Sequence, residues 1–548
     1  MPPFDAIIVG SGACGGWAAM QLTQAGMNVL MLEAGSPIDP ARDFGHKQPY
    51  QLDYRGAGKP GLARKYQGTE RNYRIMIDNS ENPYTTSEDT VYRWSRSRIL
   101  GGRTLHWARA SDRMADYEFK AASRDGYGLD WAVSYSDMSP YYDRVEQFIG
   151  VSGQREGFPQ FPDGEFLPVM PLNCAETIFT AACRSMNWPT THRRLAQLTQ
   201  MHNRRPPCHY CGNCINGCDV GAMFSTVSST LPVALKTGRL TVRTDSVVAS
   251  VRMNSENRAQ GVTYIERFTG KSVAVDGKFV LLAASTLENT RLLLLSAKGG
   301  LANSSGTLGH YMMDQLSAAG VTGYLPKLKG GPSRLDDGKL AGITIPNMVN
   351  FDGKSARKDF IRGYVMNATG GQTEFAAFSG TLPGFGSAWK REVKSLYVAQ
   401  ARVWIAGGEM LAQKENHVEL DPEVKDHWGI PVLKIHFKHC DNDRKLIAHF
   451  QQAADELFRK AGGEKIPAAP EEPPKNVIGG SIHEVGTARM SVDPKQGVLN
   501  SFCRTHDIPN LYVFGGNAFP STGDKHPTLT MMALTARGCD HLLDEAKA

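Results

Sequence analysis

The sequence predicts an α/β fold whose amino terminus is a Rossmann-like nucleotide-binding unit. Residues 4–9 (FDAIIV) form a buried-strand pattern, and the glycine-rich run GSGACG follows directly at 10–15. A helical pattern then covers 16–25, and a second strand pattern at 28–32 (NVLML) precedes an acidic residue. Farther along, 279–294 (FVLLAASTLENTRLLL) again has the pattern of a buried strand that breaks into a helix. This order is typical of a parallel sheet covered by helices.

Length and composition are those of an ordinary globular protein. The 548 residues suffice for roughly three to four domain-sized units or for one large two-domain enzyme. A hydrophobic share of 41% and a charged share of 21% exclude disorder, a collagen-like repeat and a coiled coil. The net charge of +6 is mild for this length and gives no reason to expect nucleic acid as a partner.

The sequence predicts neither a membrane span nor a secretion signal. No run of about 18 or more apolar residues occurs. The chain opens MPPFDAIIVG, without a basic segment or a small-residue cleavage site, so we expect no signal peptide of its own. We therefore expect assembly in the cytoplasm, followed either by retention there or by export to the periplasm with a partner subunit that carries the signal.

The amino-terminal unit has the residues that hold a dinucleotide. Gly10 permits the tight turn, Gly12 lets the backbone approach a pyrophosphate, and Gly15 allows close packing of helix on strand. Glu33 follows the second strand and can accept a hydrogen bond from the adenosine ribose. An acid at this position disfavours a phosphorylated ribose, but FAD and NAD use the same unit, so the unit alone leaves both cofactors open.

Three further groups of motifs point to FAD. They are 98–107 (RILGGRTLHW), the strand–helix at 279–294, and a tail that contains 483–490 (HEVGTARM), 511–520 (LYVFGGNAFP) and 526–530 (HPTLT). In this order they resemble the glucose–methanol–choline (GMC) oxidoreductases, a family of FAD-dependent alcohol oxidases and dehydrogenases. The resemblance implies bound FAD and an alcohol substrate, and its motifs cover the FAD-binding half of the chain.

The resemblance also implies two interleaved domains. A Rossmann-like FAD-binding domain would comprise 1–45, 91–130, 201–310 and 475–548, including a cysteine loop at 205–222. An α+β substrate domain built on an antiparallel sheet would comprise 46–90, 131–200 and 311–466. An amphipathic helix is predicted near 441–461, and the segment 467–474 (PAAPEEPP) is predicted to be an extended proline-rich linker between the two domains.

Two histidines are the candidate catalytic residues. In the family, the HxVGTxxM segment carries a histidine that faces the reacting carbinol, and the (H/N)PT segment carries a second polar residue beside the flavin. The matching positions are His483 and His526. Oxidation of an alcohol requires removal of the hydroxyl proton while a hydride leaves for flavin N5, and an imidazole is suited to take that proton. A single histidine is more often an ordinary core or surface residue, but two within family segments favour catalysis.

Two glycine-rich segments would border the flavin. The segment 98–107 contains Gly101, Gly102 and His106, and in the pyranose oxidase, gluconate dehydrogenase and fructose dehydrogenase branches a histidine at this spacing is bonded covalently to the flavin. The resemblance implies such a bond at His106, with noncovalent packing over the isoalloxazine as the alternative. Many members have an aspartate in the segment before the final motif, whereas this chain reads FGGN at 514–517. Asn517 is therefore the candidate cofactor-binding residue of this loop, which would offer backbone N–H groups without the carboxylate.

Four of the ten cysteines fall within eleven residues. Cys208, Cys211, Cys214 and Cys218 have the spacing C-x₂-C-x₂-C-x₃-C, which is typical of iron–sulfur binding. Asp219 follows where the ferredoxin run has proline. A [4Fe–4S] cluster is the preferred assignment and a [3Fe–4S] cluster the alternative. Zinc ribbons separate their cysteine pairs by a longer spacer, and four cysteines this close fit poorly into two unstrained disulfides.

The motifs together predict a sugar dehydrogenase. A cluster accepts one electron at a time, so it would pass the electrons of reduced flavin to a protein partner. This combination resembles the catalytic subunits of bacterial sugar dehydrogenases, which often work with a small accessory subunit and a cytochrome c. The alternatives are an oxidase that uses O₂ and has a structural cysteine loop, and a noncatalytic electron-transfer subunit. Which sugar and which acceptor are used is not encoded in any motif we identify.

Two other segments carry chemistry-bearing residues for which we expect structural roles. The segment 434–440 (KIHFKHC) is predicted to be a strand, so His436 and His439 should point to opposite faces and act as ordinary strand residues. The segment 308–315 (LGHYMMDQ) resembles a family segment near the flavin, with a packing role equally favoured.

Overall fold

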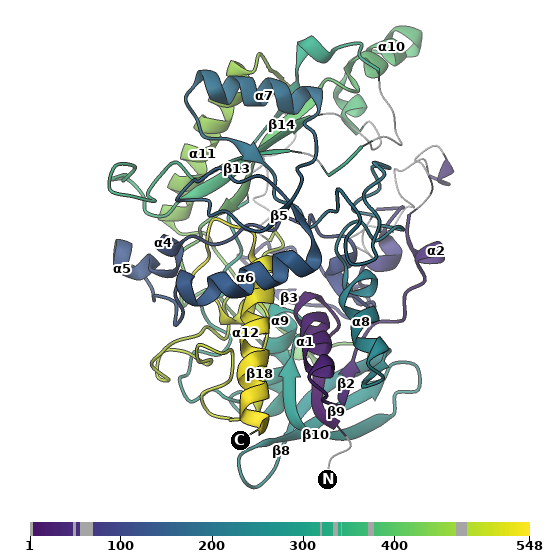
Figure 1. The fold of residues 1–548 in the computed structure, drawn as a ribbon, viewed down its shortest axis with the longest axis vertical. Coiled ribbons are helices and arrows are strands. Elements are labelled where there is room, and N and C mark those ends of the chain that lie inside the picture. The colour runs from purple at the N-terminus through teal and green to yellow at the C-terminus, as the bar shows by residue number, and fades with distance from the viewer. Residues whose placement is uncertain are drawn as a thin grey trace.

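Two large β-sheets organise the chain, one in each half of the molecule, as the computed structural model shows (Figure 1). The structure describes residues 4–45, 47, 51–54, 69–317, 320–332, 338–340, 342–370, 377–466 and 479–547. The predicted linker at 467–474 lies outside the described residues. Both chain ends lie at the same end of the molecule, beside the first sheet (Figure 1).

The first sheet contains the Rossmann-like unit. Its parallel strands lie in the order β7-β2-β1-β10-β18, and β10 also pairs antiparallel with β9, which pairs with β8. All of β2 and most of β1 are buried, as expected for strands with helices on both faces. The strands are β1 (Phe4–Val9), β2 (Val29–Leu32), β7 (Leu240–Arg243), β8 (Ser246–Met253), β9 (Ala259–Glu266), β10 (Ser272–Leu282) and β18 (Leu511–Val513).

Helices cover this sheet. Helices α1 and α12 lie side by side, and α6 and α8 pack against them (Figure 1). Helix α1 begins three residues earlier than predicted, because the glycine-rich turn itself forms its first turn. The helices are α1 (Ala13–Gln24), α6 (Tyr135–Ile149), α8 (Thr230–Lys236), α9 (Thr286–Ser296) and α12 (Pro527–Lys547).

The second sheet is antiparallel and has the strand order β17-β11-β14-β13-β12-β6. Helices α7 and α11 pack against it, and α11 covers all but the last residue of the predicted 441–461 helix. The elements are β6 (Thr191–His192), β11 (Val321–Tyr324), β12 (Ile343–Ile345), β13 (Tyr364–Gly370), β14 (Gln400–Gly408), β17 (Glu464–Lys465), α7 (Cys174–Ser185) and α11 (Asp441–Lys460).

Smaller elements connect the two sheets. A hairpin of β15 and β16 pairs with β3 and lies against α9. The remaining strands and helices are β3 (Thr85–Thr86), β4 (Val151–Ser152), β5 (Phe166–Leu167), β15 (His417–Lys425), β16 (Pro431–His436), α2 (Pro40–Asp43), α4 (Asp116–Phe119), α5 (Ala121–Asp125) and α10 (Gly386–Leu396). Short 3₁₀ turns lie at Tyr73–Ile75, Gly102–Leu105, Thr226–Ser228, Pro326–Leu328, Ala377–Thr381 and Gly516–Ala518.

The predicted fold class is confirmed: a Rossmann-like parallel sheet and an antiparallel sheet with its own helices alternate along the chain. One local prediction is wrong, because β16 ends at His436 and His439 lies beyond the strand. Within the described residues, every helix is too short or too polar to cross a membrane.

Candidate functional site

A cavity of about 440 Å³ lies at the carboxyl ends of the parallel strands, where the α1 turn, the β10–α9 turn and the tail motifs meet. This edge of a doubly wound sheet is the usual place for a nucleotide. Most of the predicted catalytic and cofactor-binding residues reach it from five separate segments. Those that line the cavity are Gly10, Gly12, Glu33, Gly102, His106, His483 and His526.

The turn before α1 leaves room for a pyrophosphate. Gly10 has φ +99°, and a Cβ at that position would lie 2.5 Å from the carbonyl oxygen of Ala283, so only glycine fits. At Gly12 a Cβ would meet nothing within 4 Å, and Gly12 gives α1 no side-chain cap. The first N–H groups of α1 are therefore available to an anion. Gly15 lies behind the turn, where a Cβ would lie 2.0 Å from the carbonyl oxygen of Gly10.

Glu33 closes the other side of the nucleotide turn. Its carboxylate accepts hydrogen bonds from the Ser11 hydroxyl (2.6 Å) and from the backbone N–H groups of Ser11 (3.1 Å) and Gly35 (2.8 Å). These bonds fix the carboxylate at the cavity wall, where a ribose hydroxyl can donate to it. The uncapped helix, the open space at Gly12 and this acid fit the adenosine and pyrophosphate parts of FAD.

His106 lines the same cavity as the nucleotide turn. Its Nε2 lies 2.6 Å from the Ser97 hydroxyl, and the imidazole is buried beside Arg109 and Arg103. Burial first, and then these two cations, lower the pKa of His106 to about 3. The imidazole is therefore neutral at any physiological pH. Gly101 is held beside it, with its N–H donating to the Ser11 hydroxyl at 2.8 Å.

Asn517 lies behind the cavity wall that Gly515 and Gly516 form. Its side chain is fully buried, and its Nδ2 donates to the Thr286 carbonyl at 2.6 Å while its Oδ1 accepts from Asn289 at 2.9 Å. The side chain thus connects the tail motif to α9, and its hydrogen-bonding atoms are occupied by protein contacts. Only the backbone before Asn517 borders the cofactor cavity.

The amide of Gln315 fixes the tautomer of His483. Gln315 Nε2 donates to two backbone carbonyls, those of Gly523 and Lys525, so its Oε1 must face the imidazole. That oxygen lies 2.8 Å from His483 Nδ1 and can only accept, so Nδ1 carries the hydrogen. The lone pair of His483 therefore sits on Nε2. Asp314 assists by accepting from the His483 backbone N–H at 2.8 Å.

The hydrogen-bond partner of the His526 imidazole is a carboxylate, whereas that of His483 is an amide. Its Nδ1 lies 2.9 Å from Asp112 Oδ2, and its ring centroid lies 5.2 Å from that of His483 at an interplanar angle of 81°. Burial, then the charges of His526 and Arg103, lower the pKa of His483 well below its usual value. The pair thus combines an imidazole that an amide orients with a second imidazole that a carboxylate orients.

The cysteine loop adjoins this cavity. Ile215, inside the C-x₂-C-x₂-C-x₃-C run, lines the same cavity as His106. Between them lies Arg109, fully buried, whose guanidinium donates to the Cys214 carbonyl at 2.8 Å and to the Leu105 carbonyl at 2.9 Å. The loop therefore rests on the segment that follows the predicted flavin-linked histidine.

The other three cysteines of the loop lie near enough to Cys214 to act on its thiol electrostatically. The pKa of Cys214 is raised to about 12, first by burial and then by the other three cysteines, whereas Arg109 lowers it. Cys208 Sγ accepts hydrogen bonds from Gln197 Nε2 at 3.0 Å and from the Tyr210 N–H at 3.4 Å. Such bonds to sulfur are typical of cluster-binding thiolates, so the donor set of this loop fits an iron–sulfur cluster.

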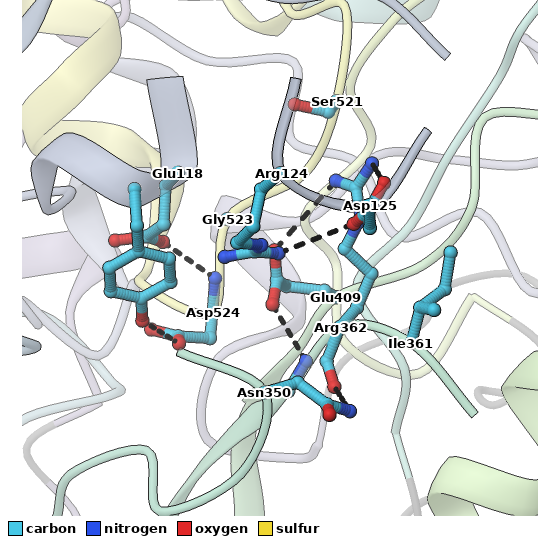
Figure 2. Close-up of polar contacts among 12 residues, drawn as sticks. Glu118, Arg124, Asp125, Asn350, Ile361, Arg362, Glu409, Ser521, Gly523 and Asp524 are labelled. Carbon is cyan, nitrogen blue, oxygen red and sulfur yellow. Dashed lines mark hydrogen bonds and ion pairs between the residues drawn. The ribbon is translucent and has the colours of Figure 1, made fainter. Parts of the chain in front are cut away.

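A buried ionic network supports the segment that leads into His526 (Figure 2). Glu118 of α4 accepts from the Asp524 N–H at 2.8 Å and pairs with buried Lys525 at 3.0 Å. Burial and the charge of Asp524 raise the pKa of Glu118 to about 8. Farther along, Figure 2 shows Glu409 between the guanidinium groups of Arg124 and Arg362.

This network connects α4 and α5 to the loops flanking β13 and β14 and to the tail. It therefore fixes the Gly523 and Lys525 carbonyls, which accept hydrogen bonds from Gln315 and orient its amide. The sequence motifs identified His483 and His526 but not Asp112, Arg109 or the buried network. The 308–315 segment was a usable signal, since it contains both Asp314 and Gln315.

Replacement of Gln315 should separate a positioning role from a structural one. Gln315→Leu removes the acceptor that fixes the tautomer, and we expect kcat to fall roughly tenfold to 100-fold, part of what a general base contributes. Gln315→Glu puts a carboxylate beside Nδ1, which stabilises the imidazolium and raises the pKa of His483. Because the base works only when neutral, the acid limb of the kcat profile should then move up by about one pH unit.

The matched control is Gln400→Leu, a buried glutamine of β14 whose amide donates to the Tyr397 carbonyl. We expect this variant to keep the wild-type pH profile. An unchanged acid limb in Gln315→Glu, or an equal shift in the control, would show that Gln315 does not set the protonation of His483.

Comparison with known protein families gives a match over most of the chain. The amino-terminal family model described as GMC oxidoreductase matches residues 4–317, and the carboxy-terminal model of the same description matches residues 412–535. The two matched segments contain the nucleotide turn, the cysteine loop, Gln315 and both cavity histidines.

Full-length relatives include both dehydrogenases and oxidases. The chain is 28% identical to the fructose dehydrogenase large subunit of Gluconobacter japonicus, covering 99% of this chain and 98% of that protein. It is 27% identical to paromamine 6'-oxidase of Streptomyces fradiae, covering 100% and 91%. Among solved structures, pyridoxine 4-oxidase from Mesorbium loti superposes with a TM-score of 0.64 at 16% identity, over 98% of this chain and 99% of that chain, which is a likeness of fold alone.

Proposed function

Because the chain belongs to the GMC oxidoreductase family and is an FAD-dependent oxidoreductase, we propose that it oxidises a hydroxyl group of a sugar or glycoside to a carbonyl. The observation that carries this proposal is the pair of cavity imidazoles with unlike partners, Gln315 behind His483 and Asp112 behind His526. The sugar class is supported by the full-length relative named fructose dehydrogenase.

The two histidines would have different roles in the oxidation of the hydroxyl group. His483 Nε2, unprotonated because Nδ1 carries the hydrogen, takes the hydroxyl proton. His526, whose Nδ1–H faces Asp112, donates a hydrogen bond from Nε2 to the oxygen as negative charge develops there, provided that both of its ring nitrogens carry hydrogen. FAD, when bound, supplies the hydride acceptor at N5. Gly10, Gly12, Glu33 and the uncapped start of α1 would hold its nucleotide part in the cavity.

We further propose that electrons leave the site one at a time through an iron–sulfur cluster bound by Cys208, Cys211, Cys214 and Cys218. Three observations support it: the ferredoxin-like spacing, the N–H bonds to Cys208 sulfur, and the position of the loop against the cofactor cavity. A bound cluster would supply a one-electron carrier. A [4Fe–4S] cluster is preferred over [3Fe–4S], because four cysteines are present.

The acceptor would then be a protein. A relative named as a large subunit supports assembly with further subunits, and we propose a small accessory subunit and a cytochrome c or similar one-electron carrier. Cofactor loading in the cytoplasm, with or without later export alongside such a subunit, remains part of the proposal.

A second function is favoured by the relative named paromamine 6'-oxidase. In that case O₂ would take both electrons from reduced flavin, hydrogen peroxide would form, and the cysteine loop would be structural. An activity screen separates the two. Monosaccharides, polyols and glycosides are tested with an artificial electron acceptor under argon, and with O₂ alone while peroxide is measured. Turnover with the dye but little peroxide supports the dehydrogenase; equal turnover with O₂ supports the oxidase.

The flavin should be bonded to His106. A neutral imidazole at the cavity wall has one unprotonated ring nitrogen, which such a bond requires. After acid precipitation, wild-type protein should keep its yellow colour in the pellet, and His106→Ala should release all flavin to the supernatant. The control His202→Ala, an imidazole that contacts the Gln147 carbonyl away from this cavity, should retain it. Complete release of flavin from the wild type would establish noncovalent binding.

A further inference from the structure

Three imidazoles are stacked on the surface of the β15–β16 hairpin, apart from the catalytic cavity. His417 of β15 lies directly opposite His436 of β16, with ring centroids 4.2 Å apart and planes within 4°. His310 stacks against His417 at 5.2 Å. Glu419, two residues after His417 and so on the same face of β15, reaches His436 Nε2 at 3.0 Å.

Two of these histidines, His417 and His310, have the backbone hydrogen bond that is typical of a metal-binding histidine. His417 Nδ1 lies 2.7 Å from the Glu415 carbonyl, and His310 Nδ1 lies 3.0 Å from the Lys414 carbonyl. A carbonyl can only accept, so both Nδ1 atoms carry hydrogen and both Nε2 atoms keep their lone pairs. A metal-binding histidine almost always donates its other N–H in this way, because the bond fixes the tautomer and the ring orientation.

The spacing of the ligand atoms fits a small divalent cation. One nitrogen of His417, one nitrogen of His436 and a carboxylate oxygen of Glu419 all lie within 4.8 Å of one another. In a tetrahedral zinc site, with bonds of about 2.0–2.2 Å, the ligand atoms are about 3.3 Å apart. The 3.0 Å contact between Glu419 and His436 is already near that value, and the two stacked rings would turn about χ2 so that their in-plane lone pairs converge on the ion. The Glu419 side chain is 53% exposed, which gives a cation a path of entry.

We propose that His417, Glu419 and His436 bind a divalent transition-metal ion of the Zn²⁺ type, with water in the fourth position and with His310 packed against the ring of His417. The ion would tie β15 to β16 next to the segment that leads to Asp314 and Gln315, since the backbones of His310 and His417 form a β-bridge. This role is structural and does not depend on the substrate or on the acceptor.

The test is Zn²⁺ titration of the flavin- and iron-loaded protein by calorimetry after dialysis against a chelator. We expect the wild type to bind one more equivalent of Zn²⁺ than His417→Ala or His436→Ala. Zn²⁺ should also raise the melting temperature of the wild type but not of these variants. Each single replacement should weaken binding by more than roughly 100-fold, because even the loss of a residue that only orients a ligand costs about 10–100-fold.

The control is His427→Ala, which removes an exposed histidine from the turn of the same hairpin and should leave the titration unchanged. A crystal soaked in ZnCl₂ should give an anomalous peak between His417, Glu419 and His436. Equal Zn²⁺ stoichiometry in the wild type and in His436→Ala, or a zinc peak only elsewhere on the chain, would overturn the proposal.

Discussion

His483→Ala should abolish reduction of the flavin by substrate while leaving the spectrum of the bound flavin intact. The imidazole is the proposed general base, whose free Nε2 would take the hydroxyl proton, and a general base of this kind contributes on the order of 10²- to 10⁴-fold to the rate. The flavin cradle at Gly10, Gly12 and Glu33 is built from other segments, so cofactor content should not change. Anaerobic stopped-flow absorbance at the flavin band measures both quantities.

The lowered pKa of His483 also predicts how the rate of flavin reduction depends on pH. Burial and the charges of His526 and Arg103 lower the pKa of His483, so the base stays neutral as the pH falls through 6.5. Flavin reduction in the wild type should therefore persist below that pH. His427→Ala, on the exposed hairpin turn, serves as the control and should reduce its flavin at the wild-type rate. Normal reduction in His483→Ala would mean that the base is another residue.

Cys214→Ser should remove the iron and uncouple the two half-reactions. We expect its flavin to be reduced by substrate at nearly the wild-type rate, because the loop contributes only Ile215 to the cavity. Electron transfer to a one-electron protein acceptor such as cytochrome c should fall to background, since the cluster is the proposed exit. Iron analysis, single-turnover flavin reduction and steady-state cytochrome reduction measure the three effects.

Cys174→Ser is the matched control, since Cys174 is exposed at the start of α7 and lies outside the motif. This variant should retain its iron content and its rate of cytochrome reduction. Full cytochrome reduction by Cys214→Ser would mean that electrons leave by another route. Loss of flavin reduction in that variant would mean that the loop takes part in substrate oxidation.

Local patterns were sufficient to predict the nucleotide-binding half of the fold, whereas the antiparallel sheet was predicted from the family resemblance. The hydrophobic run 4–9, the glycines after it and Glu33 define a strand–turn–helix–strand unit, and the structure has each of these elements within a few residues. The family deduced from the ordered motifs is confirmed by matches over 4–317 and 412–535. The domain boundaries within this frame, including the linker at 467–474, remain a proposal.

The site was only partly predictable because its supporting residues carry no local signal. Asp112 lies 414 positions from His526 and Gln315 lies 168 positions from His483, so only the folded chain brings each pair together. The same holds for His436, which looked like an ordinary strand residue until β15 placed His417 and Glu419 beside it. Asn517 shows the opposite case, because a position named by its motif turns out to serve packing of α9.

One measurement tests the central claim most directly: the visible spectrum and iron content of anaerobically purified protein, before and after dithionite. The proposal of a flavin joined to a cluster predicts flavin bands on a broad iron–sulfur absorption, both bleached by dithionite, with about three to four iron atoms per chain. A flavin spectrum alone, in protein without iron, would contradict it.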